Sequence, residues 1–254
     1  MEPNMKNFNT ILAVGAVAGV CGAAEAAVVA SQNFNGMTTS PTSALPSGWQ
    51  FSSGSNPTFG GANSYTAVTA NVGVGGTLSS GGTYLFVDGP LATGSDKAVG
   101  FLTSSSVSSP RAIMFQYTND SGSSLDSFTA SWDYEKYRNG TRQFDWKFYV
   151  SADGTNWTAV MGGDQTYSSD ASNGSQSTAP STITKSDISL TLASPLASGA
   201  SLYLRWSYVG LAGSSNAQAL ALDNFSLSAT AVPAPGALAL LGAAGLVGTS
   251  RRRR

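Results

Sequence analysis

Residues 128–150 have the sequence FTASWDYEKYRNGTRQFDWKFYV, in which large apolar side chains alternate with polar ones. The apolar and aromatic side chains of one face occupy every second position in both halves: Phe128, Ala130, Trp132 and Tyr134, then Phe144, Trp146, Phe148 and Val150. Because successive side chains of a β-strand point to opposite faces, this period of two predicts two strands, each with one buried face. Asn139 and Gly140 favour a turn between them.

The same alternation recurs at residues 113–117 and 202–208. Between such runs lie clusters of Gly, Asn, Asp and Ser, which favour turns. Within the body of the chain we find no pattern typical of an amphipathic helix. Many short strands joined by turns predict an all-β fold, an antiparallel β-sandwich of jelly-roll type over residues 28–228.

Two connections within the predicted sandwich stand out. Residues 148–160, FYVSADGTNWTAV, predict a hairpin with Asp153-Gly154 at its corner, since Gly accepts the positive φ that a tight turn needs. Residues 164–180 lack apolar periodicity and predict a long surface loop.

Charged residues are scarce, at 11% of the 254 residues, against about 25% in ordinary globular proteins. From residue 28 to 232, eight Lys and Arg stand against twelve Asp and Glu, a net charge of −4. A mildly acidic body without a basic stripe argues against nucleic-acid binding. The absence of histidine from the sequence excludes a Ser-His-Asp triad, a Cys-His pair and an imidazole metal ligand.

The N-terminal segment has the three parts of a secretory signal peptide. Lys6 precedes an apolar run at residues 11–20, and Ala24-Glu25-Ala26 follows as a cleavage site. We therefore expect a signal helix over residues 1–27. Cys21 is the single cysteine, so the processed protein would contain neither a disulfide nor a thiol nucleophile.

The C-terminal segment combines prolines, a short apolar run and four arginines. Residues 236–248 are apolar or small, a run shorter than the roughly 20 residues that a spanning helix needs. The arginines after it would stay on the cytoplasmic side by the positive-inside rule. Residues 236–254 thus predict a short transmembrane helix with an Arg cluster, a temporary anchor that a linker at residues 229–235 joins to the sandwich.

This order of parts resembles the PEP-CTERM sorting signal of Gram-negative bacteria, which exosortase-type membrane proteases process. The matching residues are Val232, Pro233 and Pro235, and the basic cluster Arg251, Arg252, Arg253 and Arg254; Ala234 stands where the family usually has Glu. A GPI signal, the competing interpretation, would end in its hydrophobic run. The resemblance implies an exosortase partner, transient membrane association, and delivery to the cell surface or extracellular matrix.

The body resembles a β-sandwich module of secreted bacterial proteins that often precedes such a tail. The resemblance rests on NFNG (33–36), LPSGW (45–49), DKAVGFL (96–102), the segment 117–140, LYLRWSYVG (202–210) and ALALDNFSLSA (219–229). It implies the fold and an exported location, and it implies no defined activity.

Asp133 and Glu135 form a candidate catalytic pair, because they share one face of a predicted strand with Cβ atoms about 6.5–7 Å apart. An inverting glycosidase has its carboxyl groups about 6.5–9.5 Å apart, so the spacing permits glycoside hydrolysis. Lys136, Arg138 and Arg142 are close in sequence and offer the alternative of a structural ion-pair cluster.

Asp223, Asn33 and Asn35 form a candidate Ca²⁺ site. Asn33 and Asn35 flank Phe34 on the first predicted strand, Asp223 begins the last, and the terminal strands of a jelly roll often lie side by side. Calcium takes oxygen ligands of this kind. The alternatives are turn capping and an ion pair between Asp223 and Arg205.

Trp49 and Trp157 are candidate sugar-stacking residues, because both lie next to turns. The other three tryptophans are in phase with predicted core positions, where large aromatic side chains are more often found.

Together these features predict an exported, non-catalytic β-sandwich protein whose tail is processed for sorting to the cell surface. A carbohydrate-binding module that holds matrix polysaccharide is one alternative, and a glycoside hydrolase is the other. No cofactor is expected apart from the structural Ca²⁺.

Overall fold

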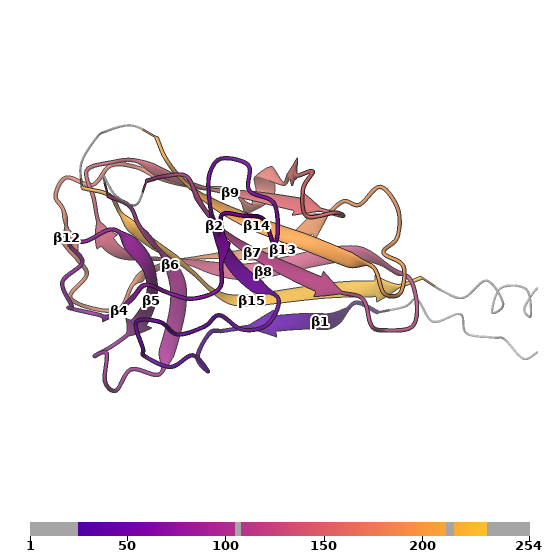
Figure 1. Cartoon of the computed structure of the whole chain (residues 1–254), viewed down its shortest axis with the longest axis horizontal. Helices are drawn as coiled ribbons and strands as arrows, with labels where there is room; N and C mark the ends of the chain where they lie inside the picture. Colours follow the sequence, from indigo (N-terminus) through magenta and orange to yellow (C-terminus); the bar gives the residue numbers. More distant parts are fainter. Residues whose placement is uncertain (1–24, 105–107, 212–215, 233–254) are drawn as a thin grey trace, which may run out of the picture. The chain divides into compact units, whose positions relative to one another are not determined.

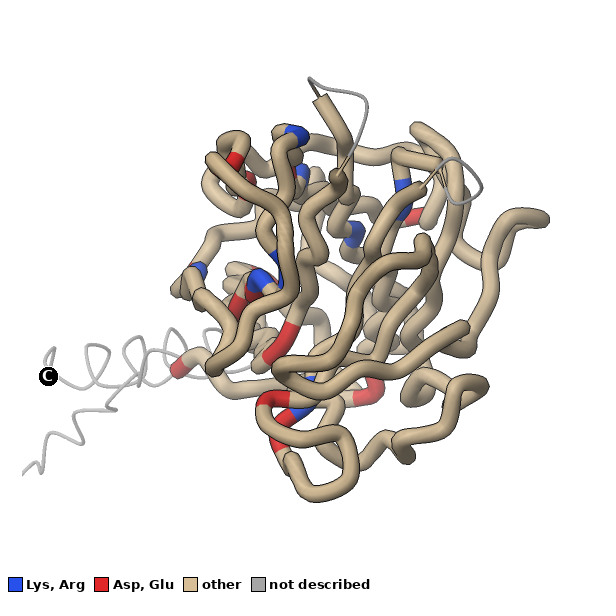
Figure 2. Tube along the Cα trace, turned by 90° about the vertical axis from the view of Figure 1, so that its left-hand side faces the viewer, with Lys and Arg blue, Asp and Glu red and all other residues tan. Residues whose placement is uncertain are grey.

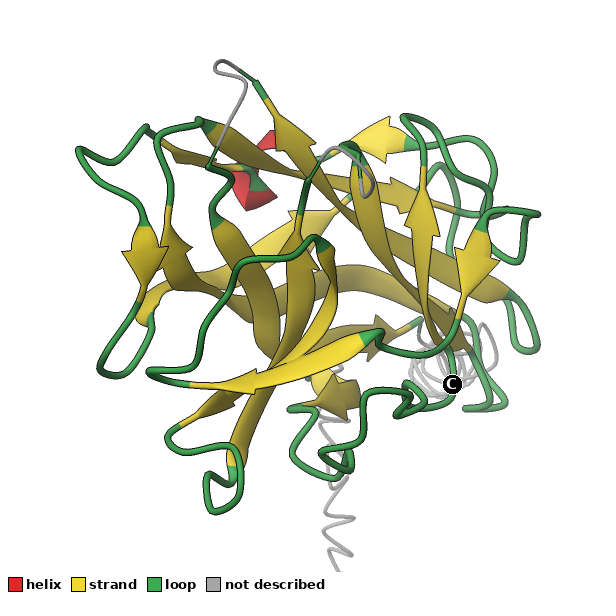
Figure 3. Ribbon diagram, turned by 60° about the vertical axis from the view of Figure 1, so that its left-hand side comes forward, coloured by secondary structure: helices red, strands yellow, loops and turns green. Residues whose placement is uncertain are grey.

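The computed structural model describes residues 25–104, 108–211 and 216–232. Two β-sheets pack against each other in this part of the chain, and its one helix is a single 3-10 turn, η1 at Met161–Gly163 (Figure 1 and Figure 3). The all-β sandwich is therefore confirmed. The predicted signal helix and C-terminal helix lie outside the described residues, within which no helix has the length and hydropathy to cross a bilayer.

Sheet I has eight strands in the order β12, β8, β15, β6, β5 and β4, with β13 also paired to β8 and β1 also paired to β15. Their bounds are β1 Ala27–Gln32, β4 Ala70–Gly73, β5 Gly82–Asp88, β6 Asp96–Leu102, β8 Leu125–Asn139, β12 Gly174–Ser175, β13 Ser181–Leu190 and β15 Ala219–Ala231. All pairs are antiparallel except β4 with β5, which is parallel and departs from the predicted purely antiparallel arrangement.

Sheet II has seven strands in the order β10, β9, β14, β7, β2 and β3, with β11 also paired to β9. Their bounds are β2 Trp49–Ser53, β3 Ser64–Tyr65, β7 Arg111–Thr118, β9 Phe144–Ser151, β10 Thr158–Ala159, β11 Gln165–Tyr167 and β14 Ser201–Gly210. The predicted hairpin is present as β9 and β10, and Gly154 at its corner has a φ of 72°.

Aromatic rings from both sheets fill the space between them. Trp132 of β8 lies 5.5 Å from Trp206 of β14, measured between ring centroids. Trp146 of β9 stacks on Tyr134 of β8 at 5.4 Å, and Phe101 of β6 meets it from the same sheet at 6.2 Å. All five side chains are at most 1% exposed, so the predicted phase of these strands is confirmed.

β15 is the central strand of sheet I, and it changes neighbours along its length. Its first part pairs with β6 through Leu222, and its last part pairs with β1, where Ala27 faces Ala229 (Figure 1). A register shift against β8 begins at Asp223, close to the point where β6 gives way to β1. The chain thus enters and leaves the sandwich at one end.

Backbone pairing corrects two predicted boundaries. The sandwich includes Ala27 and runs to Ala231, which pairs with Leu125, so it extends into both segments predicted to flank it. The predicted loop at 164–180 contains β11 and β12, which join β9 and β8. Such short ladders depend on backbone hydrogen bonds and leave no apolar period in the sequence.

Candidate functional site

Three carboxyl groups from three adjacent strands meet on sheet I. Asp96 begins β6, Glu135 lies on β8, and Asp223 lies on β15 between them. One oxygen of each lies within 4.8 Å of the other two. Alternation along β8 places Glu135 on the face opposite the core residue Trp132, so this acidic cluster lies on the outer face of sheet I.

Two of the three acidic residues are buried, and the acidic cluster lacks a positive partner. Asp223 is 0% exposed and Glu135 is 5% exposed. Neither carboxylate oxygen of Asp223 accepts a hydrogen bond, whereas Glu135 accepts one from the Tyr137 hydroxyl at 2.7 Å. Among the described residues, the salt bridges involve none of the three acids.

Burial and mutual repulsion favour the neutral, protonated form of these carboxyl groups. Burial above all raises the pKa of Asp223 to about 8; the nearby Asn224 backbone N–H acts against this rise, and the neighbouring carboxylates, Glu135 first, add to it. Burial likewise raises the pKa of Glu135 to about 7, against the lowering effect of its bond from Tyr137. Buried carboxylates of this kind take up protons or bind a cation.

Lys97 follows Asp96 in sequence, yet its ammonium group bonds to backbone carbonyl oxygens and forms no salt bridge with the acidic cluster. Its ammonium donates to the carbonyl oxygens of Asn35 at 2.7 Å and Met37 at 2.8 Å. The Asn35 side chain in turn donates to Asp96 Oδ1 at 3.1 Å and accepts from the Lys97 backbone N–H at 2.6 Å. The turn after β1 is thereby tied to β6, and Asn35 orients the Asp96 carboxylate.

The predicted Ca²⁺ residues are thus partly brought together. Asn35 lies one hydrogen bond from the acidic cluster, whereas Asn33 Oδ1 accepts from the Asn35 backbone at 3.2 Å. Both asparagines follow β1, which ends at Gln32, and Asp223 lies within β15 instead of at its start. The alternative ion pair with Arg205 is wrong, because Arg205 belongs to sheet II and donates to Asn56 at 2.9 Å.

The proposed catalytic pair has two separate environments. Asp133 uses both oxygens, accepting from the Thr184 hydroxyl at 2.6 Å and from the Asn224 amide at 2.9 Å. Glu135 turns to Tyr137 and the acidic cluster. The alternative of an ion-pair cluster around this pair is also wrong, because Lys136 pairs with Asp170 at 2.6 Å.

The two candidate tryptophans differ. Trp49 is 4% exposed and packs between the sheets, with its ring centroid 4.7 Å from that of Phe115 on β7 and 5.2 Å from that of Phe225 on β15. Its prediction as a sugar platform is therefore wrong. Trp157 is half-buried, and the Arg205 guanidinium lies 4.7 Å from its ring centre. Sugar stacking on Trp157 stays a prediction.

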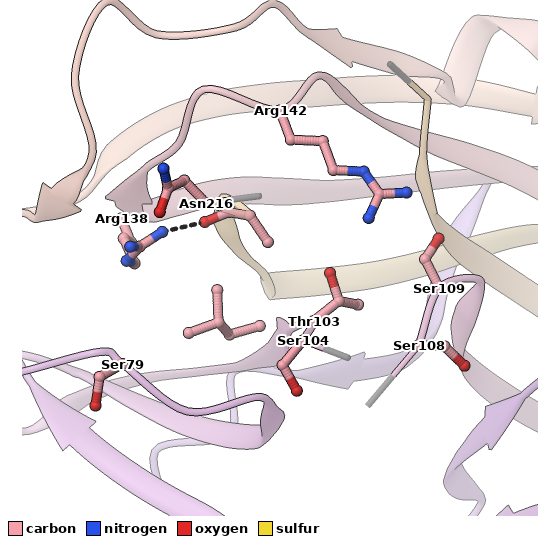
Figure 4. Close-up of a pocket in the computed structure, with 10 residues that line it drawn as sticks. Ser79, Thr103, Ser104, Ser108, Ser109, Arg138, Arg142 and Asn216 are labelled. Carbon is pink, nitrogen blue, oxygen red and sulfur yellow. Dashed lines mark hydrogen bonds between the residues drawn. The ribbon is translucent and has the colours of Figure 1, made fainter. Parts of the chain in front are cut away.

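A pocket of about 460 Å³ lies at the end of the sandwich where β8 ends and β15 begins. Figure 4 shows Arg138 and Arg142 on one side of it, with Ser79, Thr103 and Ser104 on the other. Arg138 donates to the carbonyl oxygen of Ala217, which also lines the pocket. We call this the distal pocket, because it lies at the end opposite the chain's entry and exit. Its guanidinium and hydroxyl groups suit an anionic, hydroxyl-rich ligand.

No protein-family model matches this chain, and no curated protein matches it. Among solved structures, the K3 cleaved adhesin domain of Lys-gingipain from Porphyromonas gingivalis is similar at 11% identity and a TM-score of 0.43, over 79% of this chain and 98% of that one. The CBM22-1 xylan-binding domain from Paenibacillus barcinonensis Xyn10C is similar at 10% identity and a TM-score of 0.37, over 84% of this chain and 100% of that one. Similarity this distant assigns neither ligand nor activity to the chain.

Proposed function

We propose that this is an exported, non-catalytic β-sandwich protein of jelly-roll type, sorted to the cell surface or extracellular matrix by exosortase-type processing of its C-terminal tail. The observation that carries the proposal is the order of parts after the last strand: Val-Pro-Ala-Pro at residues 232–235, an apolar run, and Arg251 to Arg254. Proline favours extended backbone at its own and at the preceding position, a form that a protease cleft can bind.

The described fold is compatible with display from one end. Ala27 pairs with Ala229, so the chain enters and leaves at the same end of sheet I. The Val232 backbone N–H donates to Ser124 O at 2.9 Å, so the first residue of the proposed sorting motif is bonded to the sandwich. A signal and an anchor attached there would leave the opposite end of the sandwich exposed.

The chemistry of the body supports a non-catalytic role. The sequence has no histidine, and Cys21 lies in the predicted signal. Asp133 is held by two hydrogen bonds from neighbouring strands, which leaves the proposed glycosidase pair without two free carboxyl groups.

The test is expression of the chain in a host that has an exosortase, followed by mass spectrometry of surface protein. We expect wild-type protein to lack Arg254. Changing Pro233 and Pro235 together to Ala should leave the protein membrane-bound and unprocessed, and changing Arg251 to Arg254 to Ser should misplace it. A matched control, Thr249→Ala, should be processed normally. Surface protein that retains Arg254 would show that the tail is only a short anchor.

Binding of an acidic matrix polysaccharide is a second candidate function, favoured by the distal pocket. β15 spans 13 residues, so about 40 Å of strand separates the pocket from the end that bears the tail. Arg138 and Arg142 would pair with sugar carboxylates, and the hydroxyls of Ser79 and Ser109 would bond to sugar hydroxyls.

A glycan array with the surface-processed protein tests this second candidate. We expect uronate-containing glycans to be retained over neutral ones, and Arg142→Gln to weaken retention about tenfold, the loss of roughly one charge-assisted bond. Lys185→Gln on β13 removes an equal charge elsewhere and should have no effect. Equal retention by both variants would exclude the distal pocket.

A further inference from the structure

We propose that Asp96, Glu135 and Asp223 bind a Ca²⁺ ion that joins β6, β8 and β15 on the outer face of sheet I. This inference does not depend on the proposed sorting or polysaccharide binding. It differs from the site predicted from sequence, because Asp96 and Glu135 take the place of the two asparagines as ligands and only Asp223 is common to both sites.

The distances suit one calcium ion. No two of the closest carboxylate oxygens are more than 4.8 Å apart. Calcium binds oxygen at about 2.3–2.6 Å, so oxygens on opposite sides of one ion are about 4.6–5.2 Å apart. All three side chains can therefore reach a single ion with small rotations. Three carboxylates supply up to six oxygens, and water can complete the six to eight that calcium takes.

The Asp223 side chain provides a second, independent indication of a cation site. It is 0% exposed, and neither of its oxygens has a hydrogen-bond partner. Buried polar groups are almost always partnered, and an unpartnered buried carboxylate is among the costliest of them. Its aim toward Asp96 and Glu135 shows where the partner belongs.

The surrounding hydrogen bonds hold the other two carboxylates in place. Asn35 donates to one oxygen of Asp96, and Tyr137 donates to one oxygen of Glu135. Outer partners of this kind orient ligands and sharpen a metal site. The register shift between β15 and β8 follows Asp223 directly, and bulges are common next to functional sites.

The charged groups near the acidic cluster do not neutralise it, so an external cation is needed to do so. Asp88 and Asp133 add to the negative field around Glu135, and the Lys97 ammonium is bound by backbone carbonyls. A doubly charged cation would offset two of the three cluster charges at once. It would also fix the turn after β1, since Asp96 is bonded to Asn35.

The first test is thermal melting of the full chain in detergent micelles, in EDTA and in CaCl₂. A tenfold excess of Ca²⁺ over its Kd should raise Tm by about 3–6 °C, because ligand binding stabilises only the folded state. Asp223→Asn should abolish the shift. Asp120→Asn, an exposed acid outside the acidic cluster, should keep it. The same shift in both variants would place the ion elsewhere and overturn the assignment.

The second test is independent of variant folding. TbCl₃ titrated into wild-type protein should give sensitised emission, because Tyr137 donates a hydrogen bond to a proposed ligand. CaCl₂ should quench that emission by competition, and calorimetry should give one Ca²⁺ per chain. Glu135→Gln should weaken binding at least tenfold. Wild-type protein that shows neither a melting shift nor calorimetric heat at millimolar Ca²⁺ would overturn the proposal.

Discussion

The outer faces of the two sheets both bury charged side chains, yet they balance them differently. On sheet II, Lys147 Nζ lies 3.1 Å from a carboxylate oxygen of Asp145 and 3.1 Å from one of Asp164. On sheet I, the acidic cluster gathers three carboxyl groups, and none of them joins a salt bridge within the described residues. Figure 2 shows how unevenly Asp and Glu are distributed around the domain.

Sheet II also provides internal compensation for a buried cation. Arg205 is 2% exposed, and its guanidinium lies 4.0 Å from the ring centre of Tyr149 and 4.7 Å from that of Trp157. The side-chain oxygen of Asn56 accepts a hydrogen bond from the Arg205 guanidinium at 2.9 Å. Burial lowers the pKa of Arg205, and its contact with Tyr149 acts in the opposite direction. The aromatic faces thus replace part of the lost hydration.

The difference distinguishes structural charge from ligand-binding charge. Where a buried charge has its partners on the same chain, folding alone brings them together, and its contribution to stability needs no ligand. Where partners are missing, the folded state is strained until a proton or an ion supplies them. The comparison therefore predicts that added Ca²⁺ stabilises the protein through the charges on sheet I. It also predicts that the contribution of the charges on sheet II does not depend on Ca²⁺.

The largest effect should come from the core that both faces share. Trp146→Ala removes a 0% exposed side chain that stacks on Tyr134, and it should lower the free energy of unfolding by about 3–5 kcal/mol. The loss should be equal in EDTA and in CaCl₂, because the core contains neither charge system. Denaturant titrations in both buffers measure it, and a loss below about 1 kcal/mol would place this side chain at the surface.

The next largest effect should come from Arg205 on sheet II. Arg205→Ala should cost about 2–3 kcal/mol, since it removes two desolvated ring contacts and the packing of the side-chain stem. Arg205→Lys keeps the charge but loses the planar stacking, so it should recover only part of the loss. Urea titrations with and without Ca²⁺ should give the same values; a calcium-dependent loss would contradict the separation of the two faces.

Local patterns predicted the fold because the buried faces follow a period of two. Trp132, Trp146 and Trp206 lie where their alternation placed them. The prediction that Trp49 is exposed was wrong. Its neighbours Pro46 and Gly48 indicate a turn, whereas its burial follows from the pairing of Trp49 with Phe115 of β7. That pairing is a long-range property, and no short window of sequence contains it.

The acidic cluster was only partly predictable for the same reason. Asp223 was identified from the adjacency of the terminal strands, which the pairing of β1 with β15 confirms. Asp96 and Glu135 join it only because β15 lies between β6 and β8. The sequence signal that could have found Asp96 is its place at the start of a strand next to Lys97, and that signal is weak without the strand order.

A separate effect should appear in the pH dependence of stability without metal. The folded-state pKa values of Asp223 and Glu135 are raised from 3.8 and 4.5 to about 8 and about 7. The folded state therefore binds more protons than the unfolded chain between these limits, and stability is lost as pH rises through about 7 and 8. In EDTA the free energy of unfolding should fall from the acidic to the basic limit, and denaturant titrations at a series of pH values measure that fall.

The groups that surround this pair set the size of the fall. Asp88, Asp96 and Asp133 favour protonation, while the Tyr137 hydroxyl favours the charged form of Glu135. Glu135→Gln should flatten the EDTA profile, because it removes one charge and keeps an acceptor for Tyr137. Calcium should flatten the wild-type profile in the same way. Stability that rises with pH in EDTA would contradict the uncompensated charge on this face.

The smallest effect should come from removing the cation on sheet II, which leaves its carboxylates without a positive partner, as on sheet I. Lys147→Met leaves Asp145 and Asp164 without their shared cation; since the Lys147 side chain is 37% exposed, solvent screening limits the loss to about 1 kcal/mol or less. Calcium should not restore it. Asp164 Oδ1 already accepts from the Phe148 backbone N–H at 2.9 Å, so this face offers two carboxylates and fewer free oxygens than the acidic cluster. Melting of Lys147→Met in an Asp223→Asn background measures this directly. Restoration by millimolar Ca²⁺ would mean that any neighbouring acidic pair on this domain binds the ion, and that the three-strand arrangement on sheet I has no special role.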